Sequence, residues 1–296
     1  GVCLSGGIDS AILAYTMSGI TKNFTSYTAS YERFKDKEKN LAKDFASHIG
    51  IHHKSTFLEN KDIFTLLSRM ICQQQEPIGG LQTIAYYKMH EFAKKDGVKV
   101  LLEGQGIDEI LGGYPYYERI VNGEFTDTKN IHIDGTYINT NDFLTDEYQN
   151  SFNKNRKVKY KFSNLIDYQI YDIEFRKIPR VLRMNDLLSM HSSIELRVPF
   201  LDPELMIFCL ALKDNFKIFN KVGKYLHRNF AEKSLRLKIN QKKSTIVTPQ
   251  NSLITGVLID KVLDIISVLK YDQRINYKKL LSFIEASKNC NLNNSF

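Results

Sequence analysis

The sequence predicts an α/β fold, a parallel sheet with helices on both faces, followed by a mostly helical C-terminal part. In residues 1–110, short apolar runs of the β type alternate with amphipathic helical patterns, as in strands joined by helical crossovers. Glycine-rich turns follow the first and the last of these runs. From Leu165 to Ala231, apolar residues recur mainly at helical spacing. At 296 residues, the chain can form one large or two smaller domains with a proper core.

The individual elements follow from these patterns. The expected strands are "VCL" at residues 2–4, Phe24–Ser30, "HHKSTF" at 52–57 and Val98–Glu103. The expected helices between them are Asp9–Ser18, Asp36–Ile49, Asp62–Cys72 and Ile84–Lys95. Gly50 is the expected C′ residue that ends the second helix. A polar stretch, 122–161, is expected to be an insertion or lid, and "LRVPFLD" at 196–202 to be extended.

Composition excludes several classes of protein. Apolar runs such as "MIFCLAL" are too short to span a bilayer. The four cysteines are far apart without a C-x-x-C pair, which predicts reduced thiols in the cytoplasm. The net charge of +8 suits either nucleic acid or acidic small molecules such as nucleotides, but only Asn153–Lys161 concentrates it, and we expect a solvated surface there. We therefore expect no membrane and no nucleic-acid partner.

The two glycine-rich turns are "SGGIDS" at residues 5–10 and "GQGIDE" at 104–109. Because parallel strands place their carboxyl ends at one sheet edge, both turns should lie there. Glycines let the backbone approach an anion, and N–H groups at the following helix start point toward it. The chain has no Walker A pattern, so Asp9 and Asp108 are predicted to bind a Mg²⁺ that bridges a pyrophosphate. The alternative for each turn is a tight connection whose aspartate caps a helix.

Several stretches resemble one family of enzymes. "LSGGIDS" resembles the PP-loop of the ATP pyrophosphatases, whose fold is of the adenine nucleotide alpha hydrolase type. The other stretches resemble signatures of the asparagine synthetase branch and are, in order, Glu103–Tyr117, Arg183–Leu205, Gly223–Arg228 ("GKYLHR") and Lys242–Pro249 ("KKSTIVTP"). The chain is thus similar, from Gly1 to Asn251, to the C-terminal synthetase domain of glutamine-hydrolysing asparagine synthetases.

The resemblance implies an ATP-dependent ligase. The aspartate side-chain carboxylate would attack ATP, releasing pyrophosphate, and ammonia would displace AMP to give asparagine, with ATP and Mg²⁺ as cofactors. It implies a synthetase domain at 1–251, including the insertion, and a helical tail at 252–296. It also implies a glutaminase domain upstream in the full-length protein, with a homodimer as the assembly to consider.

The resemblance also implies roles for particular residues. Lys243 would be a cation for the α-phosphate, with Asp108 and Gln105 as further catalytic residues. Asp9 and Asp108 would bind the metal, and Asp202 is expected to be structural. Nucleotide binding would fall to the residues Leu4, Ser5, Gly6, Gly7, Asp9, Ser10, Glu103 and Gly104, while Asp186, Glu195 and Arg197 could serve substrate or structural roles.

Departures from the family pattern leave alternatives open. Gln105 replaces the family's acid, Glu103 replaces a serine close to the expected adenine, and Thr245 replaces a glycine after the catalytic lysine. The same adenylation could therefore act on another carboxylate, as in β-lactam synthetases or surface-polysaccharide amidotransferases. A non-catalytic nucleotide-binding module is the other alternative. Cys3 lies within the first strand and is expected to be a buried thiol rather than a glutaminase nucleophile.

Overall fold

The computed structural model describes residues 1–31, 37–76, 78–123, 143–154, 162, 164–235 and 258–289. The chain divides into two compact units. The first, an α/β unit, comprises Gly1–Phe125 and Ser163–Thr248, and the second comprises Thr126–Phe162 and Pro249–Phe296. Both glycine-rich turns belong to the first unit.

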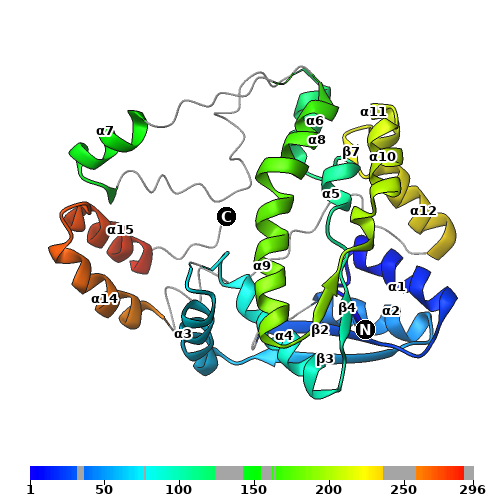
Figure 1. The fold of residues 1–296 in the computed structure, drawn as a ribbon, viewed down its shortest axis with the longest axis horizontal. Helices are drawn as coiled ribbons and strands as arrows, with labels where there is room; N and C mark the ends of the chain where they lie inside the picture. Colours follow the sequence, from blue (N-terminus) through cyan, green and yellow to red (C-terminus); the bar gives the residue numbers. More distant parts are fainter. Residues whose placement is uncertain are drawn as a thin grey trace. The chain divides into compact units, whose positions relative to one another are not determined.

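The α/β unit contains a five-stranded sheet in which, within the described residues, every neighbouring pair is parallel (Figure 1). The strand order is β3-β2-β1-β4-β5. The chain builds β2 and β3 on one side of β1 and then returns to its other side for β4 and β5, so the order reverses between β1 and β4. Ligands bind at such a switch point, outside the carboxyl ends of the strands. The strands are β1 Val2–Cys3, β2 Thr25–Tyr31, β3 His52–Leu58, β4 Val100–Leu102 and β5 Glu195–Arg197.

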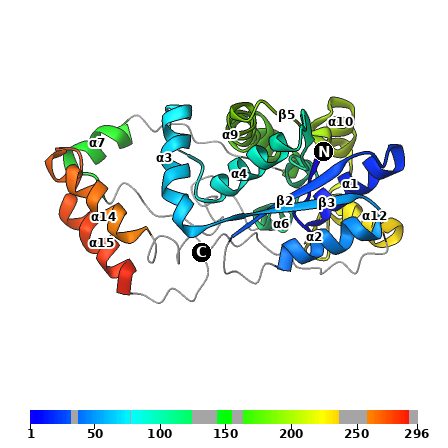
Figure 2. The same cartoon turned by 90° about the horizontal axis from the view of Figure 1, so that it is seen from below.

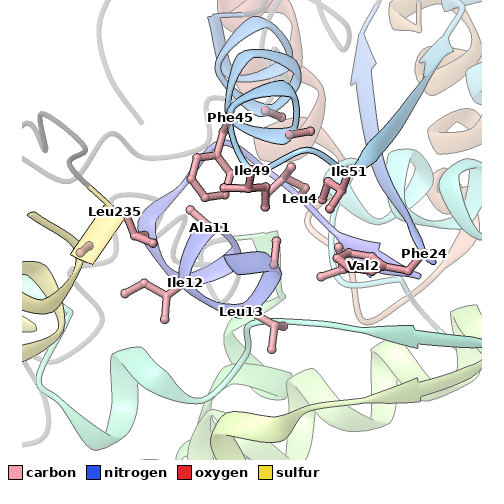
Figure 3. Packing of buried hydrophobic residues seen from close by; sticks show 14 residues of the cluster. Val2, Leu4, Ala11, Ile12, Leu13, Phe24, Phe45, Ile49, Ile51 and Leu235 are labelled. Atoms are coloured by element: carbon pink, nitrogen blue, oxygen red, sulfur yellow. The ribbon is translucent and has the colours of Figure 1, made fainter. Parts of the chain in front are cut away.

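Helices cover both faces of this sheet, which confirms the predicted fold class (Figures 1 and 2). Successive residues of β1 point to opposite faces, because side chains alternate along a strand. Val2 packs in a cluster with residues of α1, α2 and α12, as Figure 3 shows, whereas Cys3 packs with Met89 of α4 and Ile194. The helices of this unit are α1 Ile8–Ile20, α2 Lys37–His48, α3 Ile63–Gln74, α4 Gln82–Lys95, α5 Ile107–Ile110, α6 Pro115–Val121, α8 Leu165–Tyr171, α9 Ile178–His191, α10 Pro203–Ala211, α11 Asp214–Lys217 and α12 Tyr225–Leu235.

The local predictions agree with these elements in most places. Gly50 follows α2 with a φ of 69°, as a C′ glycine does. The predicted extended stretch at 196–202 is a strand only at its start, because Pro199–Leu201 forms a 3-10 turn. A short hairpin within the expected helical part was not predicted. It consists of β6 Ile218–Phe219 and β7 Val222–Gly223.

The second unit is helical where it is described. Its helices are α7 Asp146–Lys154, α14 Ile259–Val268 and α15 Tyr277–Asn289. The Phe143 and Phe283 rings lie 5.1 Å apart, and Leu144 pairs with Ile275 through an antiparallel bridge. The expected insertion and tail therefore contact each other, while the predicted domain boundary at residue 251 lies outside the described residues. No described helix is long and apolar enough to cross a membrane.

Candidate functional site

The first glycine-rich turn is closed by its two serines. The Oγ of Ser10 accepts a hydrogen bond from the backbone N–H of Ser5 and donates one to the carbonyl oxygen of Gly7, each at 3.1 Å. Since that hydroxyl has one hydrogen, the Ser5 hydroxyl is the donor across the 3.1 Å between the two Oγ atoms. Gly6 has a φ of 74°, in the left-handed region that favours glycine. The turn leads directly into α1, and the first N–H groups of a helix can bind an anion.

The second turn packs against the first. A Cβ on Gly104 would lie 3.3 Å from backbone atoms of Asp9 and Ser10, so glycine allows the two turns to touch. Gly106 has a φ of 101°, and a Cβ there would overlap the side chain of Leu201. The structure thus brings the two turns together at the carboxyl ends of β1 and β4.

Asp9 and Asp108, the two predicted metal ligands, converge on one cation. The Nζ of Lys224 lies 2.8 Å from Oδ2 of Asp9 and 2.9 Å from Oδ1 of Asp108. The lysine side chain is only 2% exposed, whereas those of Asp9 and Asp108 are 22% and 19% exposed, so the ammonium is buried beneath two partly exposed carboxylates. The Nε2 atom of His227 lies 3.3 Å from Oδ1 of Asp9. The carboxylates, the lysine and the imidazole therefore form one charged cluster at the turn.

The charges in this cluster stabilise one another. Burial opposes ionisation of Asp9, but the charge of Lys224 and the His227 ring outweigh it and hold the pKa of Asp9 well below its ordinary value. Burial likewise opposes ionisation of Lys224, yet Asp108 and Asp9 raise the pKa of its ammonium above the ordinary value. Asp9 and Lys224 are therefore both ionised at neutral pH.

The β6–β7 hairpin positions Lys224. Its turn residues Asn220 and Lys221 have φ values of 48° and 64°, as in a type I′ turn. A Cβ on Gly223 would overlap the carbonyl oxygen of Gly112, so only glycine fits there. Lys224 itself has a φ of 55°, and its N–H donates to the carbonyl oxygen of Leu111 at 3.0 Å. A non-glycine residue in this region is strained, which is a common feature of functional sites.

Lys224 and His227 were missed as site residues by the sequence reasoning. Both lie in "GKYLHR", a stretch that carried the resemblance but received no role. A lysine directly before a helix, in a segment of a family signature, was the available signal. Its partner Asp9 lies 215 positions away along the chain, so the pairing required the folded structure.

Glu103 and Gln105 hydrogen-bond each other behind the second turn. The Glu103 side chain is 5% exposed, and its Oε1 accepts a hydrogen bond from Nε2 of Gln105 at 3.2 Å. Its Oε2 accepts one from Nδ2 of Asn185 at 2.7 Å. Burial raises the pKa of Glu103 to about 7, although these two amide hydrogen bonds favour the charged form. Both oxygens of the carboxylate are thus used within the protein.

Glu109, next to Asp108, is a second buried acid. Its Oε1 accepts a hydrogen bond from the Tyr114 hydroxyl at 2.9 Å, and its backbone carbonyl oxygen accepts one from Gln169 at 2.7 Å. Burial, together with the nearby charge of Asp108, raises the pKa of Glu109 to about 7. A Cβ on Gly113 would overlap the Asp108 carboxylate, so this glycine makes room for it. The hydrogen bonds from Tyr114 and Gln169 to Glu109 therefore hold the segment that carries Asp108 in place.

The remaining predicted residues have other surroundings. Asp202 caps α10, since its Oδ1 accepts hydrogen bonds from the N–H groups of Glu204 and Leu205, a structural role as expected. Cys3 is buried, as expected. Glu195 and Arg197 pair with each other on the surface at 2.8 Å, and the backbone carbonyl oxygen of Asp186 accepts a hydrogen bond from the Ser189 hydroxyl. Leu4 is buried in the core cluster, and Lys243 and Thr245 lie outside the described residues.

Comparison with known proteins identifies the family. The model of the asparagine synthase family matches residues 1–289. The chain belongs to the asparagine synthase family. The match includes both glycine-rich turns and the segment that contains Lys224. Membership of this family supports ATP-dependent amidation in general and a ligase of the asparagine synthetase type.

Individual relatives of this asparagine synthase domain are distant. It is 25% identical to asparagine synthetase [glutamine-hydrolyzing] 1 of Bacillus subtilis, over 96% of this chain and 52% of that protein. It is 26% identical to a putative asparagine synthetase [glutamine-hydrolyzing] 1 of Methanocaldococcus jannaschii, over 83% of this chain and 38% of that protein. The chain thus spans about half the length, or less, of these relatives. A solved structure described as a predicted subunit of a tRNA methyltransferase from Methanocaldococcus jannaschii aligns over 88% of this chain and 86% of its own, with 14% identity and a TM-score of 0.34.

Proposed function

We propose that this asparagine synthase domain adenylates the side-chain carboxylate of aspartate and transfers ammonia to the adenylate, giving asparagine, AMP and pyrophosphate. The observation that carries the proposal is the convergence of two glycine-rich turns, two carboxylates and a buried lysine at the switch point of a parallel sheet. The glycine-rich turns and the lysine favour a bound polyphosphate, and the two carboxylates favour the Mg²⁺ that would accompany it.

The first turn would hold the leaving pyrophosphate. Its serine hydroxyls, its glycine backbone and the N–H groups at the start of α1 are donors for phosphate oxygens. When the aspartate carboxylate attacks the α-phosphorus, negative charge builds up on the departing pyrophosphate. Fixed donors and the ammonium of Lys224 would stabilise that charge. Lys243, which the family resemblance places at the α-phosphate, would add a second cation.

The residues present fit a Mg²⁺ ion. Mg²⁺ in nucleotide sites usually takes one or two protein carboxylates and fills its other positions with phosphate oxygens and water. Asp9 and Asp108 already converge on one positive charge, so their carboxylates can share a cation. The described residues contain no group of three or more acidic, His or Cys side chains that could hold a metal without a nucleotide. When bound, Mg²⁺ would neutralise phosphate charge, and Asp9 and Asp108 would hold it.

The setting of the reaction is also part of the proposal. The names of the relatives include glutamine hydrolysis, and this chain spans about half their length or less. We therefore propose that a glutaminase domain supplies the ammonia in the full-length protein, and that the protein works in the cytoplasm, with a homodimer as the assembly to test.

The decisive assay supplies Mg·ATP, aspartate and ammonium and measures AMP and pyrophosphate. We expect both products in equal amounts and dependent on aspartate. Formation of ADP and phosphate would refute the adenylation chemistry.

A second candidate is the same adenylation of another carboxylate. The Glu103–Gln105 pair favours it, because this pair replaces the serine and the acid of the family pattern. A screen of carboxylic acids for pyrophosphate release separates the two substrates. Calorimetric binding of ATP without exchange of pyrophosphate in the presence of any acid would instead indicate a nucleotide-binding module.

A further inference from the structure

The Glu103 carboxylate is fixed in place from two sides. Glu103 directly follows β4, and its backbone N–H donates to the carbonyl oxygen of Arg197 at 2.9 Å. Its two carboxylate oxygens accept one amide hydrogen bond each, from Gln105 on the turn and from Asn185 on α9. Asn185 is itself 4% exposed. Two hydrogen bonds therefore connect Asn185 on α9, through the Glu103 carboxylate, to the Gln105 side chain.

This carboxylate lacks a positive partner among the described residues, in contrast to Asp9. Its two hydrogen-bond donors are neutral amides, and burial raises the pKa of Glu103 to about 7. The titratable and charged groups on the strands and the short helix around it are the buried Cys3 thiol on β1, Arg197 paired with Glu195 on β5, and the buried Glu109 on α5. On α9 they are Arg180, Arg183 paired with Glu76, Asp186 next to Asn185, and His191. The Asp9–Lys224–Asp108 cluster lies at the glycine turns.

The charge of Glu103 determines how the Gln105 amide points. An ionised carboxylate only accepts hydrogen bonds, so Gln105 must direct its NH₂ group toward it. The amide carbonyl oxygen of Gln105 is then the group left to accept a hydrogen bond from a ligand. A protonated Glu103 can donate, which favours the flipped amide with its NH₂ group directed outward. The pair therefore has two arrangements of opposite polarity.

The pair also borders the proposed reaction centre. Gly104, between the two residues, lies against the backbone of Asp9 and Ser10, with only 3.3 Å available to a Cβ. The adenylate in the proposed function would form beside this turn. The nitrogen that attacks its carbonyl carbon carries N–H groups, and these require acceptors in a dry site.

We propose that Glu103 is a positioning residue that, held by Asn185, directs the Gln105 carbonyl oxygen toward the incoming nitrogen nucleophile as the acceptor for one of its N–H groups. This inference rests on the proposed function and identifies the group at that site which selects for the nucleophile. Gln105 accepts a hydrogen bond and takes up no proton. Protonation of Glu103 reverses the amide and removes the acceptor.

The first experiment does not depend on turnover. The whole chain is labelled with ¹⁵N in glutamine side chains, and the Gln105 NH₂ signals, assigned with Gln105→Ala, are followed against pH. We expect an inflection at about pH 7, where Glu103 titrates, and its loss in Glu103→Gln. An inflection that persists in Glu103→Gln, or none in the wild type, overturns the coupling between Glu103 and Gln105.

The second experiment separates adenylation from nitrogen transfer. Adenylation is measured as exchange of pyrophosphate into ATP, and nitrogen transfer is measured with hydroxylamine, which stays largely uncharged at neutral pH. We expect Glu103→Gln to lower transfer about tenfold or more, as loss of an oriented hydrogen bond does, while exchange changes less than about twofold. Gln105→Glu should also lower transfer, because it places two carboxylates together.

The double variant Glu103→Gln/Gln105→Glu is the rescue, because it rebuilds an amide–carboxylate pair with reversed polarity. We expect it to recover most of the transfer rate lost in either single variant. The matched control is Glu91→Gln, which changes a surface carboxylate that pairs with Arg69.

Two results would overturn the nucleophile role. One is an equal loss of exchange and transfer with a raised KM for ATP, which would assign the pair to nucleotide binding. The other is no rescue in the double variant. If the wild type shows no acid-dependent exchange at all, the proposed function fails together with the nucleophile role, whereas the NMR inflection still decides whether Glu103 orients Gln105.

Discussion

At the scale of single residues, the buried charges of this site differ in whether they have a partner. Lys224 lies between Asp9 and Asp108, which raise the pKa of its ammonium, and its charge lowers the pKa of Asp9 in return. Among the described residues, Glu103 accepts hydrogen bonds only from neutral amides, and burial raises its pKa to about 7. The Lys224 cluster is stable only while all its charges are present, whereas Glu103 titrates near neutral pH.

The substitution Lys224→Met tests the first arrangement. It leaves the partly buried carboxylates of Asp9 and Asp108 side by side without this cation, and we expect a loss of up to about 3 kcal/mol in the free energy of unfolding at pH 7. The depressed pKa of Asp9 means that its contribution is present above its unfolded pKa and is lost as pH falls through its folded pKa. The loss caused by the substitution should therefore shrink in acid. Urea unfolding measures it, with Lys221→Met on the hairpin turn as control, and equal stability of the two variants would contradict the prediction.

Compared with the wild type, the Glu103→Gln variant should become relatively more stable as pH rises, whereas Lys224→Met should become relatively more stable as pH falls. Because the folded protein binds the Glu103 proton more tightly than the unfolded chain, protonation stabilises the fold. This contribution is present below the ordinary pKa of 4.5 and is lost as pH rises through about 7. Relative to the wild type, Glu103→Gln should therefore gain up to about 3 kcal/mol between pH 5 and pH 8. Denaturant unfolding at both pH values measures this, and parallel pH profiles would show that Glu103 is already ionised in acid.

At the scale of elements, the β6–β7 hairpin is the part that completes the site. It lies within the stretch that the sequence pattern predicted to be mostly helical. The hairpin turns at Asn220 and Lys221 and places Lys224 directly before the first residue of α12. Gly223 allows this approach, because its Cα lies against the Gly112 carbonyl. A short element of low intrinsic stability is thus held by contact with Leu111 and Gly112, directly after α5.

The substitution Gly223→Ala should displace Lys224 from its two carboxylates. The new Cβ would overlap the Gly112 carbonyl oxygen, and we expect a loss of about 1–3 kcal/mol in stability together with at least a tenfold loss of pyrophosphate exchange. Thermal unfolding and the exchange assay measure the two effects. Gly19→Ala is the matched control, since a Cβ on this helical glycine meets nothing within 4 Å. It should stabilise the chain by up to about 1 kcal/mol. An unaltered exchange rate in Gly223→Ala would show that the hairpin does not position a functional lysine.

At the scale of the whole molecule, the strand order β3-β2-β1-β4-β5 decides where the site lies. Two turns about 100 residues apart in the sequence become neighbours because β1 and β4 pair directly, with Val2 next to Leu102. The two compact units are each formed from separate stretches of the chain. A ligand bound at the switch point would therefore contact segments of the α/β unit that are distant in sequence.

Binding of Mg·ATP should raise the melting temperature of the chain. A ligand present at a hundredfold excess over its Kd stabilises the folded state by about 2.7 kcal/mol, which corresponds to roughly 5–10 °C for a unit of this size. Asp9→Asn should abolish most of the shift by removing the charge shared with Lys224, whereas Asp96→Asn, on the surface next to Lys54, should retain it. Differential scanning calorimetry measures the shift. Identical shifts in all three proteins would place the nucleotide elsewhere.

Much of the fold could be predicted because its signals are local. Helical spacing over α2 and α4, a glycine after α2, and alternating strands and helices each depend on residues close together in the sequence. The two glycine-rich turns were predicted to share one sheet edge for a general reason, since parallel strands end on the same side. The fold class and the convergence of Asp9 with Asp108 followed from the sequence by itself.

The partners of the buried charges were decided only by the tertiary structure. Lys224 pairs with Asp9, 215 positions away, and Glu103 accepts a hydrogen bond from Asn185, 82 positions away. The local sequence around each residue therefore does not predict its partner. The hairpin was missed because its strands are two residues long, too short for any periodic pattern. Local physical chemistry determined the turns and the carboxylates of this protein, whereas long-range packing determined which cation neutralises them and which acid remains without one.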